Sequence, residues 1–176
     1  VCLIDDQLKN GSREFFGELF GNENIFAPII SGKSREEVKQ GLFEKIFDQS
    51  QVLRQFDSFI LDLRLYDGDH EINSSSEISD LTGFHILKMI LHGGKYNGLN
   101  YTGNQAAQVI VLSASNKSWV CKYALENGAT DFITKEDPTK GYSRSESIDL
   151  FNQIVRSVND SLERKALFRA FKILDD

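Results

Sequence analysis

Four short apolar stretches of the chain each end in polar residues that could take part in phosphoryl chemistry. They are Asp5-Asp6 after residues 1–4, Asp62 after residues 59–61, Ser113 after residues 109–112, and Lys135 after residues 132–134. If these stretches are parallel strands of one open sheet, their carboxyl ends face the same crevice. The sequence therefore predicts that four distant segments supply one site.

The residue types of this predicted site indicate what it could do. Three carboxylates repel one another, and a set of oxygen ligands suits a hard cation such as Mg²⁺ better than zinc. With the cluster kept ionised by the cation, Asp62 is the candidate nucleophile toward a phosphoryl group. Lys135 would neutralise phosphoryl oxygens, and the Ser113 hydroxyl would donate a hydrogen bond to one of them. The pattern predicts phosphorylation of Asp62.

The elements that must position these residues follow an alternating pattern. Apolar stretches and helical patterns alternate five times, which is typical of a parallel sheet covered by helices on both faces. Strands are predicted near 1–5, 25–31, 57–62, 108–113 and 130–134. Helices are predicted near 12–20, 35–50, 82–92 and 116–127, with a last one from about Ser143. The predicted fold class is α/β, a doubly wound sheet of five parallel strands.

Three local signals mark helix ends. Ser34-Arg35-Glu36-Glu37 and Ser143-Arg144-Ser145-Glu146 have the pattern of capping boxes, in which serine and glutamate side chains bond to backbone N–H groups of the first turn. Gly128 is placed to end a helix in a left-handed conformation.

Length and composition limit the classes of function. The chain has 176 residues, of which 40% are hydrophobic and 26% charged, and this predicts a single domain over 1–176. The net charge of −6 and the lack of a basic stripe argue against nucleic-acid binding. No stretch approaches the roughly 18 apolar residues of a membrane span, and no signal peptide is visible, which predicts a cytoplasmic protein. Because Val1 already lies in a predicted strand and Met89 is the one methionine, we expect the natural N-terminus to be missing.

Two longer stretches interrupt the compact pattern. Residues 66–81 are rich in acids and serines, residues 93–108 are rich in glycine and asparagine, and both are predicted to be surface loops. Asp67-Gly68-Asp69 has the alternating acids of a calcium loop, but the ligand spacing of an EF-hand does not follow. A solvated, mobile loop near the mouth of the site is the better prediction.

The last helical pattern is longer than the sheet requires. Crossing five strands takes about 12–16 helical residues, so we expect the core to end near 162 and residues 163–176 to form a helical extension. Its apolar surface at helical spacing is supplied by Leu167, Phe168, Phe171 and Leu174. They need a partner, and packing on the same domain or a boundary inside a longer protein explains them as well as a homodimer contact does.

Four motifs occur in a fixed order, each at a predicted strand end. They are Ile4-Asp5-Asp6, Phe59-Ile60-Leu61-Asp62-Leu63-Arg64-Leu65, Val109-Ile110-Val111-Leu112-Ser113-Ala114, and the segment from Ala124 to Lys135. In this combination the chain resembles the receiver domains of response regulators, the phosphorylatable half of bacterial two-component systems. The resemblance covers Val1 to the last helix. It implies a flavodoxin-like sheet with strand order 2-1-3-4-5.

The resemblance also implies roles for the acidic residues. Asp62 would be the phosphoacceptor and a Mg²⁺ ligand. Asp6 would bind Mg²⁺ directly, Asp5 through a water molecule, and the backbone carbonyl of Arg64 would be a further ligand.

Three other residues are assigned by the same resemblance. Ser113 would sense the phosphoryl group, Phe132 would be the aromatic residue whose rotation accompanies activation, and Lys135 would be the phosphate-binding lysine. We expect replacement of Lys135 to slow phosphorylation or to uncouple it from the conformational response, and to change fold stability little. The chain departs from the family after Lys135, where Glu136 and Asp137 precede the proline.

The implied function is a signalling switch, not a conventional turnover enzyme. A histidine kinase or a histidine phosphotransfer protein would supply the phosphoryl group, and the domain would catalyse its own phosphorylation and hydrolysis. A degenerate receiver that binds partners without phosphorylation is the alternative. A phosphohydrolase of the haloacid-dehalogenase type is disfavoured, because Arg64 stands where that family needs an acid that can donate a proton.

Overall fold

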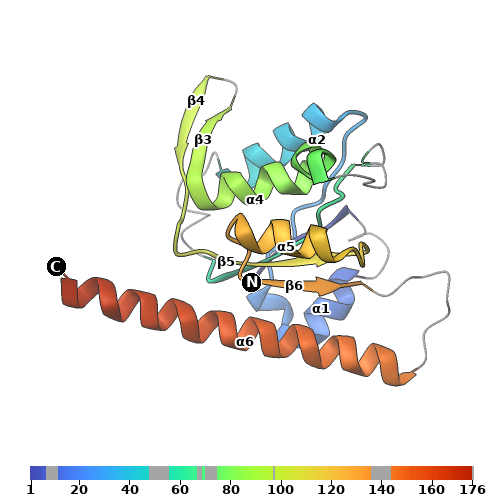
Figure 1. The fold of residues 1–176 in the computed structure, drawn as a ribbon, viewed down its shortest axis with the longest axis vertical. Helices are drawn as coiled ribbons and strands as arrows, with labels where there is room; N and C mark the ends of the chain where they lie inside the picture. Colours follow the sequence, from blue (N-terminus) through green and yellow to red (C-terminus); the bar gives the residue numbers. More distant parts are fainter. Residues whose placement is uncertain are drawn as a thin grey trace.

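A parallel sheet of four strands forms the centre of the molecule in the computed structural model, which describes residues 1–6, 12–47, 56–66, 69, 75–96, 98–135 and 144–175. The strands lie in the order β1-β2-β5-β6, with bounds Cys2–Ile4, Ser58–Leu61, Gln108–Ser113 and Asp131–Thr134. Each begins and ends within one residue of its predicted bounds. The doubly wound α/β fold class is therefore confirmed (Figure 1).

The fifth predicted strand, 25–31, is wrong as a strand. Phe26 makes one parallel bridge to Cys2, accepting a hydrogen bond from Leu3 N at 2.8 Å and donating one to the Val1 carbonyl at 3.0 Å. The ladder stops there because Pro28, two residues on, has no N–H to donate. The bridge lies at the free edge of β1, the position that the predicted order 2-1-3-4-5 gives to the second strand.

The predicted surface loop at 93–108 is also wrong in part. Strands β3 (Gly93–Tyr96) and β4 (Leu99–Thr102) pair as an antiparallel hairpin. Gly98 in its turn has a φ of +82°, which glycine adopts without the penalty that a Cβ brings. The rings of Tyr96 and Tyr101 each lie 5.1 Å from that of Phe43, so the hairpin packs on the segment that follows α2.

The predicted helices are present. They are α1 (Ser12–Phe20), α2 (Arg35–Leu42), α4 (Thr82–His92), α5 (Ser118–Glu126) and α6 (Arg144–Asp175). A π-helical turn, η3 (Phe43–Phe47), continues α2, and the short turns η2 (Asn22–Asn24) and η4 (Ser75–Asp80) are 3₁₀-helical.

The serine cap and the glycine helix end are confirmed, whereas the Glu37 carboxylate bonds one residue before the N-cap instead of within the first turn. Ser34 Oγ accepts a hydrogen bond from Glu37 N at 3.2 Å, while the Glu37 carboxylate accepts from Lys33 N at 2.7 Å. Gly128 has a φ of +95° after α5. The start of the Ser143 capping box lies outside the described residues.

Helices cover both faces of the sheet, as Figure 1 shows: α2, α4 and α5 lie on one face, and α1 and α6 on the other. The strand residues divide accordingly. Cys2 and Ile4 belong to the larger core under α2, α4 and α5, whereas Leu3 belongs to the smaller one with Phe16 and Ile154. Because successive strand residues point to opposite faces, each strand anchors both helical layers.

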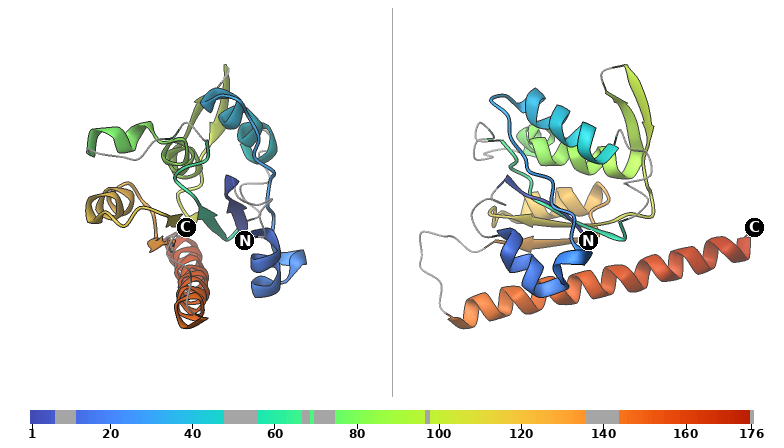
Figure 2. Two further views of the ribbon diagram at one scale, coloured as in Figure 1. Left: turned by 90° about the vertical axis from the view of Figure 1, so that its right-hand side faces the viewer. Right: turned by 180° about the vertical axis from the view of Figure 1, so that it is seen from behind.

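Helix α6 continues past Glu163, as predicted, and its C-terminal part runs beyond the sheet (Figure 2). Its packing reaches Lys165, whose ammonium is buried and donates to Asp57 at 2.9 Å and to the Phe56 carbonyl at 2.7 Å. Leu167 is 59% exposed, and the side chains of Phe168, Phe171 and Leu174 lie outside the described residues. Within the part of the chain that is described, no helix is both long enough and apolar enough to cross a bilayer.

Candidate functional site

The acidic residues at the ends of β1 and β2 lie side by side. Ile4 pairs with Leu61 in the sheet, and Asp62 N donates to the Ile4 carbonyl at 2.9 Å. One carboxylate oxygen from each of Asp5, Asp6 and Asp62 lies within 4.8 Å of the others. The fold therefore brings these three residues together, as the sequence predicts. Asp5 and Asp62 are buried, and Asp6 is partly exposed.

Lys135 joins the carboxylates from the end of β6. Its backbone N donates to the Ser113 carbonyl at 2.7 Å, which continues the β5–β6 ladder by one residue. Its ammonium contacts Asp5 Oδ2 at 2.8 Å and Asp62 Oδ2 at 2.5 Å. Burial by itself would lower the pKa of Lys135, but the charges of Asp62 and Asp5 outweigh it and raise this pKa. The lysine is therefore held as a cation between two buried acids.

The crowded carboxylates are held as anions at a cost. Burial, with the negative charges of Asp62 and Asp5 added, raises the pKa of Asp6 to about 6. Burial also raises the pKa of Asp62, against the opposing effect of Lys135. One ammonium thus compensates three acids only in part.

We expect Asp6→Asn to stabilise the protein at neutral pH when no divalent cation is present. The folded pKa of Asp6 lies above its ordinary value, so its contribution to stability is present in acid and is lost as the pH rises toward about 6. Urea unfolding in EDTA at pH 4.5 and pH 7.5 tests this: the variant should gain clearly more stability over wild type at pH 7.5 than at pH 4.5. An equal effect at both pH values would mean that Asp6 does not titrate in this range.

The turn after Asp62 is held by backbone contacts. Arg64 N donates to Asp62 Oδ1 at 3.1 Å, and Gly83 N, at the start of α4, donates to the Leu63 carbonyl at 2.9 Å. A Cβ on Gly83 would lie 2.1 Å from the Asp62 carbonyl oxygen, so only glycine permits this approach. The first turn of α4 therefore fixes the backbone that carries Asp62.

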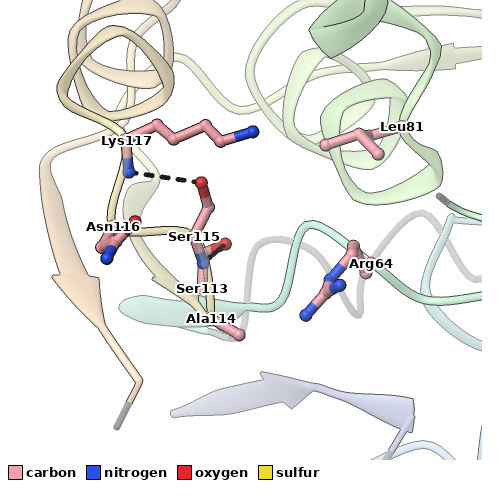
Figure 3. Close-up of a pocket in the computed structure, with 7 residues that line it drawn as sticks. All are labelled: Arg64, Leu81, Ser113, Ala114, Ser115, Asn116 and Lys117. Carbon is pink, nitrogen blue, oxygen red and sulfur yellow. Dashed lines mark hydrogen bonds between the residues drawn. The ribbon is translucent and has the colours of Figure 1, made fainter. Parts of the chain in front are cut away.

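Two small cavities adjoin this turn. One of about 160 Å³ is lined by Asp6, Asp62, Arg64, Tyr66, Asp69, Ala114 and Lys135. The other, of about 100 Å³, lies between Arg64 and Leu81 on one side and the segment from Ser113 to Lys117 on the other (Figure 3). Arg64 and Ala114 line both cavities, so the two are neighbours.

Ser113 and Phe132 lie on β5 and β6, the two strands beyond β2, in different surroundings. Ser113 is buried at the end of β5, where its Oγ accepts from Ser115 N at 3.2 Å, and it lines the smaller cavity instead of the one that Asp62 lines. Phe132 in β6 is partly buried and packs on the core that lies under α5. Ser113 thus ends one strand of the sheet, and Phe132 lies in the strand that leads to Lys135. Their roles in a switch remain predictions.

Asp69 is a residue of this region that the sequence pattern misassigns. The stretch 66–81 was predicted to be a solvated loop, but the Asp69 side chain is fully buried and bonds to Arg35 and Thr82. Asp67 and Gly68 lie outside the described residues. The burial of Asp69 shows that part of the inserted stretch is built into the wall of the site.

The donor set fits a hard cation. The described cluster of Asp5, Asp6 and Asp62 contains only carboxylate oxygens, without histidine or cysteine. Oxygen-only ligands favour Mg²⁺ or Ca²⁺ over zinc or copper. Burial, together with the negative charges of Asp62 and Asp5, raises the pKa of Asp6, and these neighbouring charges are a second reason to expect that a cation binds here.

Comparisons with known proteins identify the fold. No protein-family model and no curated protein matches the chain. NtrX from Brucella abortus, solved in complex with ADP, is 15% identical over 98% of this chain, with a TM-score of 0.55. A second structure of that NtrX is also 15% identical, over 99% of this chain, with a TM-score of 0.52. The chain spans only 28% and 29% of those two NtrX chains.

A response regulator receiver domain from Rhodospirillum rubrum is also similar. It is 18% identical over 87% of this chain and 92% of its own, but its TM-score of 0.49 adds no weight. At these identities the likeness is one of fold. The α/β fold implied by the sequence motifs is thus shared with the two NtrX structures.

Proposed function

We propose that this chain is the phosphoacceptor receiver domain of a two-component response regulator, with Asp62 as the residue that is phosphorylated. The observation that carries the proposal is the joint geometry of the site. Three carboxylates lie within 4.8 Å of one another, and the ammonium of Lys135 contacts two of them. This arrangement occurs in the crevice where a doubly wound sheet binds its ligands.

Asp5, Asp6, Asp62 and the Arg64 carbonyl would hold Mg²⁺. The cation would neutralise charge on the phosphoryl oxygens and on the acids around them. A carboxylate oxygen of Asp62 attacks phosphorus, a P–O bond to Asp62 forms, and the bond to the donor breaks with its electron pair leaving on the donor. Lys135, already an ammonium beside Asp62, then pairs with a phosphoryl oxygen, and the hydroxyl of Ser113 donates to another.

The partners follow from this chemistry. A histidine kinase or a histidine phosphotransfer protein would be the donor, and the domain would act in the cytoplasm as a switch and not as a conventional enzyme. Phosphorylation would draw Ser113 toward the phosphoryl group and shift Phe132, which packs on the core under α5. A homodimer through the end of α6 remains a prediction.

A degenerate receiver that binds partners without phosphorylation is the second candidate. It retains the fold but needs neither the acidic cluster nor Lys135. In this chain these groups are buried together, and burial raises the pKa of Asp62, so keeping its carboxylate ionised costs free energy. Groups with such shifted pKa values cluster at functional sites, which favours the phosphorylated switch.

Intact mass measurement after incubation with acetyl phosphate separates the two. With Mg²⁺ we expect wild type to gain the mass of one phosphoryl group, and with EDTA none. Asp62→Asn should gain none under either condition, while Asp149→Asn in α6, the matched control, should behave as wild type. Full phosphorylation of Asp62→Asn would mean that another residue carries the phosphoryl group. If folded wild type gains no phosphoryl group, the degenerate receiver is favoured.

A further inference from the structure

Asp69 makes an unusually complete set of contacts for an acid in an inserted segment. Its Oδ1 accepts from Arg35 Nη2 at 2.9 Å, from Arg35 Nε at 3.2 Å and from Thr82 Oγ1 at 3.1 Å. Its Oδ2 accepts from Leu65 N and Thr82 N, both at 3.3 Å. Its side chain has no exposed surface. A buried charge with five donors is held in one place.

These contacts join three elements at one carboxylate. Arg35 is the first residue of α2, Thr82 is the first residue of α4, and Leu65 belongs to the turn that follows Asp62. The N-cap residue of α4 is Leu81, which offers no side-chain oxygen. Asp69 takes over that capping role, since its Oδ2 accepts from Thr82 N and its charge lies at the positive end of the helix.

The same carboxylate fixes the backbone beside the acidic cluster. The hydrogen bond from Leu65 N lies one residue after Arg64, and Arg64 N donates to Asp62 Oδ1. On the other side, Gly83 N holds the Leu63 carbonyl. Leu63 is therefore tied to α4 and Leu65 to Asp69, while Arg64, which lies between them, bonds to Asp62.

We propose that Asp69, paired with Arg35, is a positioning residue for the phosphorylation site. It does not contact the reacting atoms; it holds the turn that presents Asp62 and the Arg64 carbonyl, and it links that turn to the start of α2. The inference rests on the proposed function for its effect on Mg²⁺ and phosphorylation. The positioning of the turn itself can be measured without either.

The first test measures how firmly the hydrogen bonds of the turn are held in the metal-free protein. Amide hydrogen exchange followed by NMR reports the Arg64 and Gly83 N–H groups. Asp69→Asn keeps the shape of the side chain but removes its charge, and we expect both amides to exchange several-fold faster. Glu36→Gln is the matched control, because it removes the ion pair between the exposed Glu36 carboxylate and Lys39 on the same helix and should leave both amides unchanged.

The second test measures the consequence at the site. Groups that orient ligands typically change metal affinity by tenfold or more, so Asp69→Asn should weaken Mg²⁺ binding about tenfold in calorimetric titration. Phosphorylation by acetyl phosphate should be slowed at low Mg²⁺ and should recover in large part at saturating Mg²⁺. Arg35→Lys, which keeps the charge but not the two-pronged contact, should give a smaller effect in the same direction, and it serves if Asp69→Asn does not fold.

The outcomes distinguish the two proposals. If folded Asp69→Asn shows wild-type exchange at Arg64 and Gly83 and wild-type Mg²⁺ affinity, the positioning role is overturned. If wild type itself neither binds Mg²⁺ nor accepts a phosphoryl group, the proposed function fails, while faster exchange in Asp69→Asn would still establish the positioning of the turn.

Discussion

Replacing Lys135 with methionine is expected to lower the free energy of unfolding by about 3 kcal/mol at neutral pH without divalent cations, because two buried carboxylates lose the ammonium they share. This is the lower end of the range for breaking a buried ion pair, since Asp62, whose pKa burial raises, can take up a proton in response. Methionine keeps the aliphatic stem, so the loss reports the charge and not the packing.

The pH dependence identifies the cause. Because the pKa of Lys135 is raised in the folded protein, its stabilising effect is present at all pH values below its ordinary pKa and is lost only as the pH rises through the higher folded value. Between neutral pH and the ordinary pKa of lysine the deficit of the variant should therefore be constant. It should shrink in acid, where Asp62, whose pKa burial raises, takes up a proton.

Urea unfolding at pH 7.5 and pH 4.5 measures this change. Lys122→Met is the matched control, because its ammonium is 3.7 Å from Glu126 and both side chains are largely exposed. We expect no measurable change there. Equal stabilities for the Lys135 and Lys122 variants would mean that the buried pairs contribute nothing to the fold.

This expectation differs from the one based on sequence, in which Lys135 is a phosphate ligand with little effect on stability. The strand ends were predictable because each apolar stretch is followed at once by a polar residue, as Leu61 is by Asp62. The pairing was not, because Lys135 meets partners that are 130 and 73 residues away, and their burial depends on the whole sheet.

The two errors in the strand assignments have local causes. Residues 25–31 have the apolar composition of a strand, but Pro28 limits the pairing to the bridge at Phe26. Strands β3 and β4 have four residues each, too short for alternation to be distinguished from a glycine-rich loop. In both places the deciding factor is a backbone hydrogen bond and not hydrophobicity.

Asp69 shows a different limit of sequence interpretation. Asp69 stands among other acids, a pattern that indicates a solvated loop. The interpretation changes only with the knowledge that Arg35, 34 residues earlier, lies beside Asp69. The sequence contained both residues, but no spacing rule connects a loop after one strand with the first turn of an earlier helix. Contacts of this kind are decided by the packing of α2 against α4.

Gly83→Ala is expected to have the second large effect, on both stability and phosphorylation. A Cβ at this position would lie 2.1 Å from the Asp62 carbonyl oxygen and 2.6 Å from Leu63 Cα. These are backbone atoms, so the clash can be relieved only by moving α4 or the turn that carries Asp62. Overpacking of this kind typically lowers the free energy of unfolding by about 1–3 kcal/mol, and we expect the upper part of that range.

Gly41→Ala provides the matched control for this substitution. Gly41 lies in α2, where an added Cβ meets no atom within 4 Å. Alanine is the better helix former, so this variant should gain about 0.5–1 kcal/mol. Urea unfolding, together with intact mass after treatment with acetyl phosphate and Mg²⁺, compares the two.

The two readouts separate stability from geometry. Under conditions where both variants are folded, Gly83→Ala should acquire its phosphoryl group much more slowly than Gly41→Ala, because the displaced turn carries both Asp62 and the Arg64 carbonyl. If the variants are phosphorylated at equal rates, the turn tolerates movement, and the close approach of α4 serves packing alone. If Gly83→Ala is also as stable as wild type, then α4 does not begin against the Asp62 turn in solution.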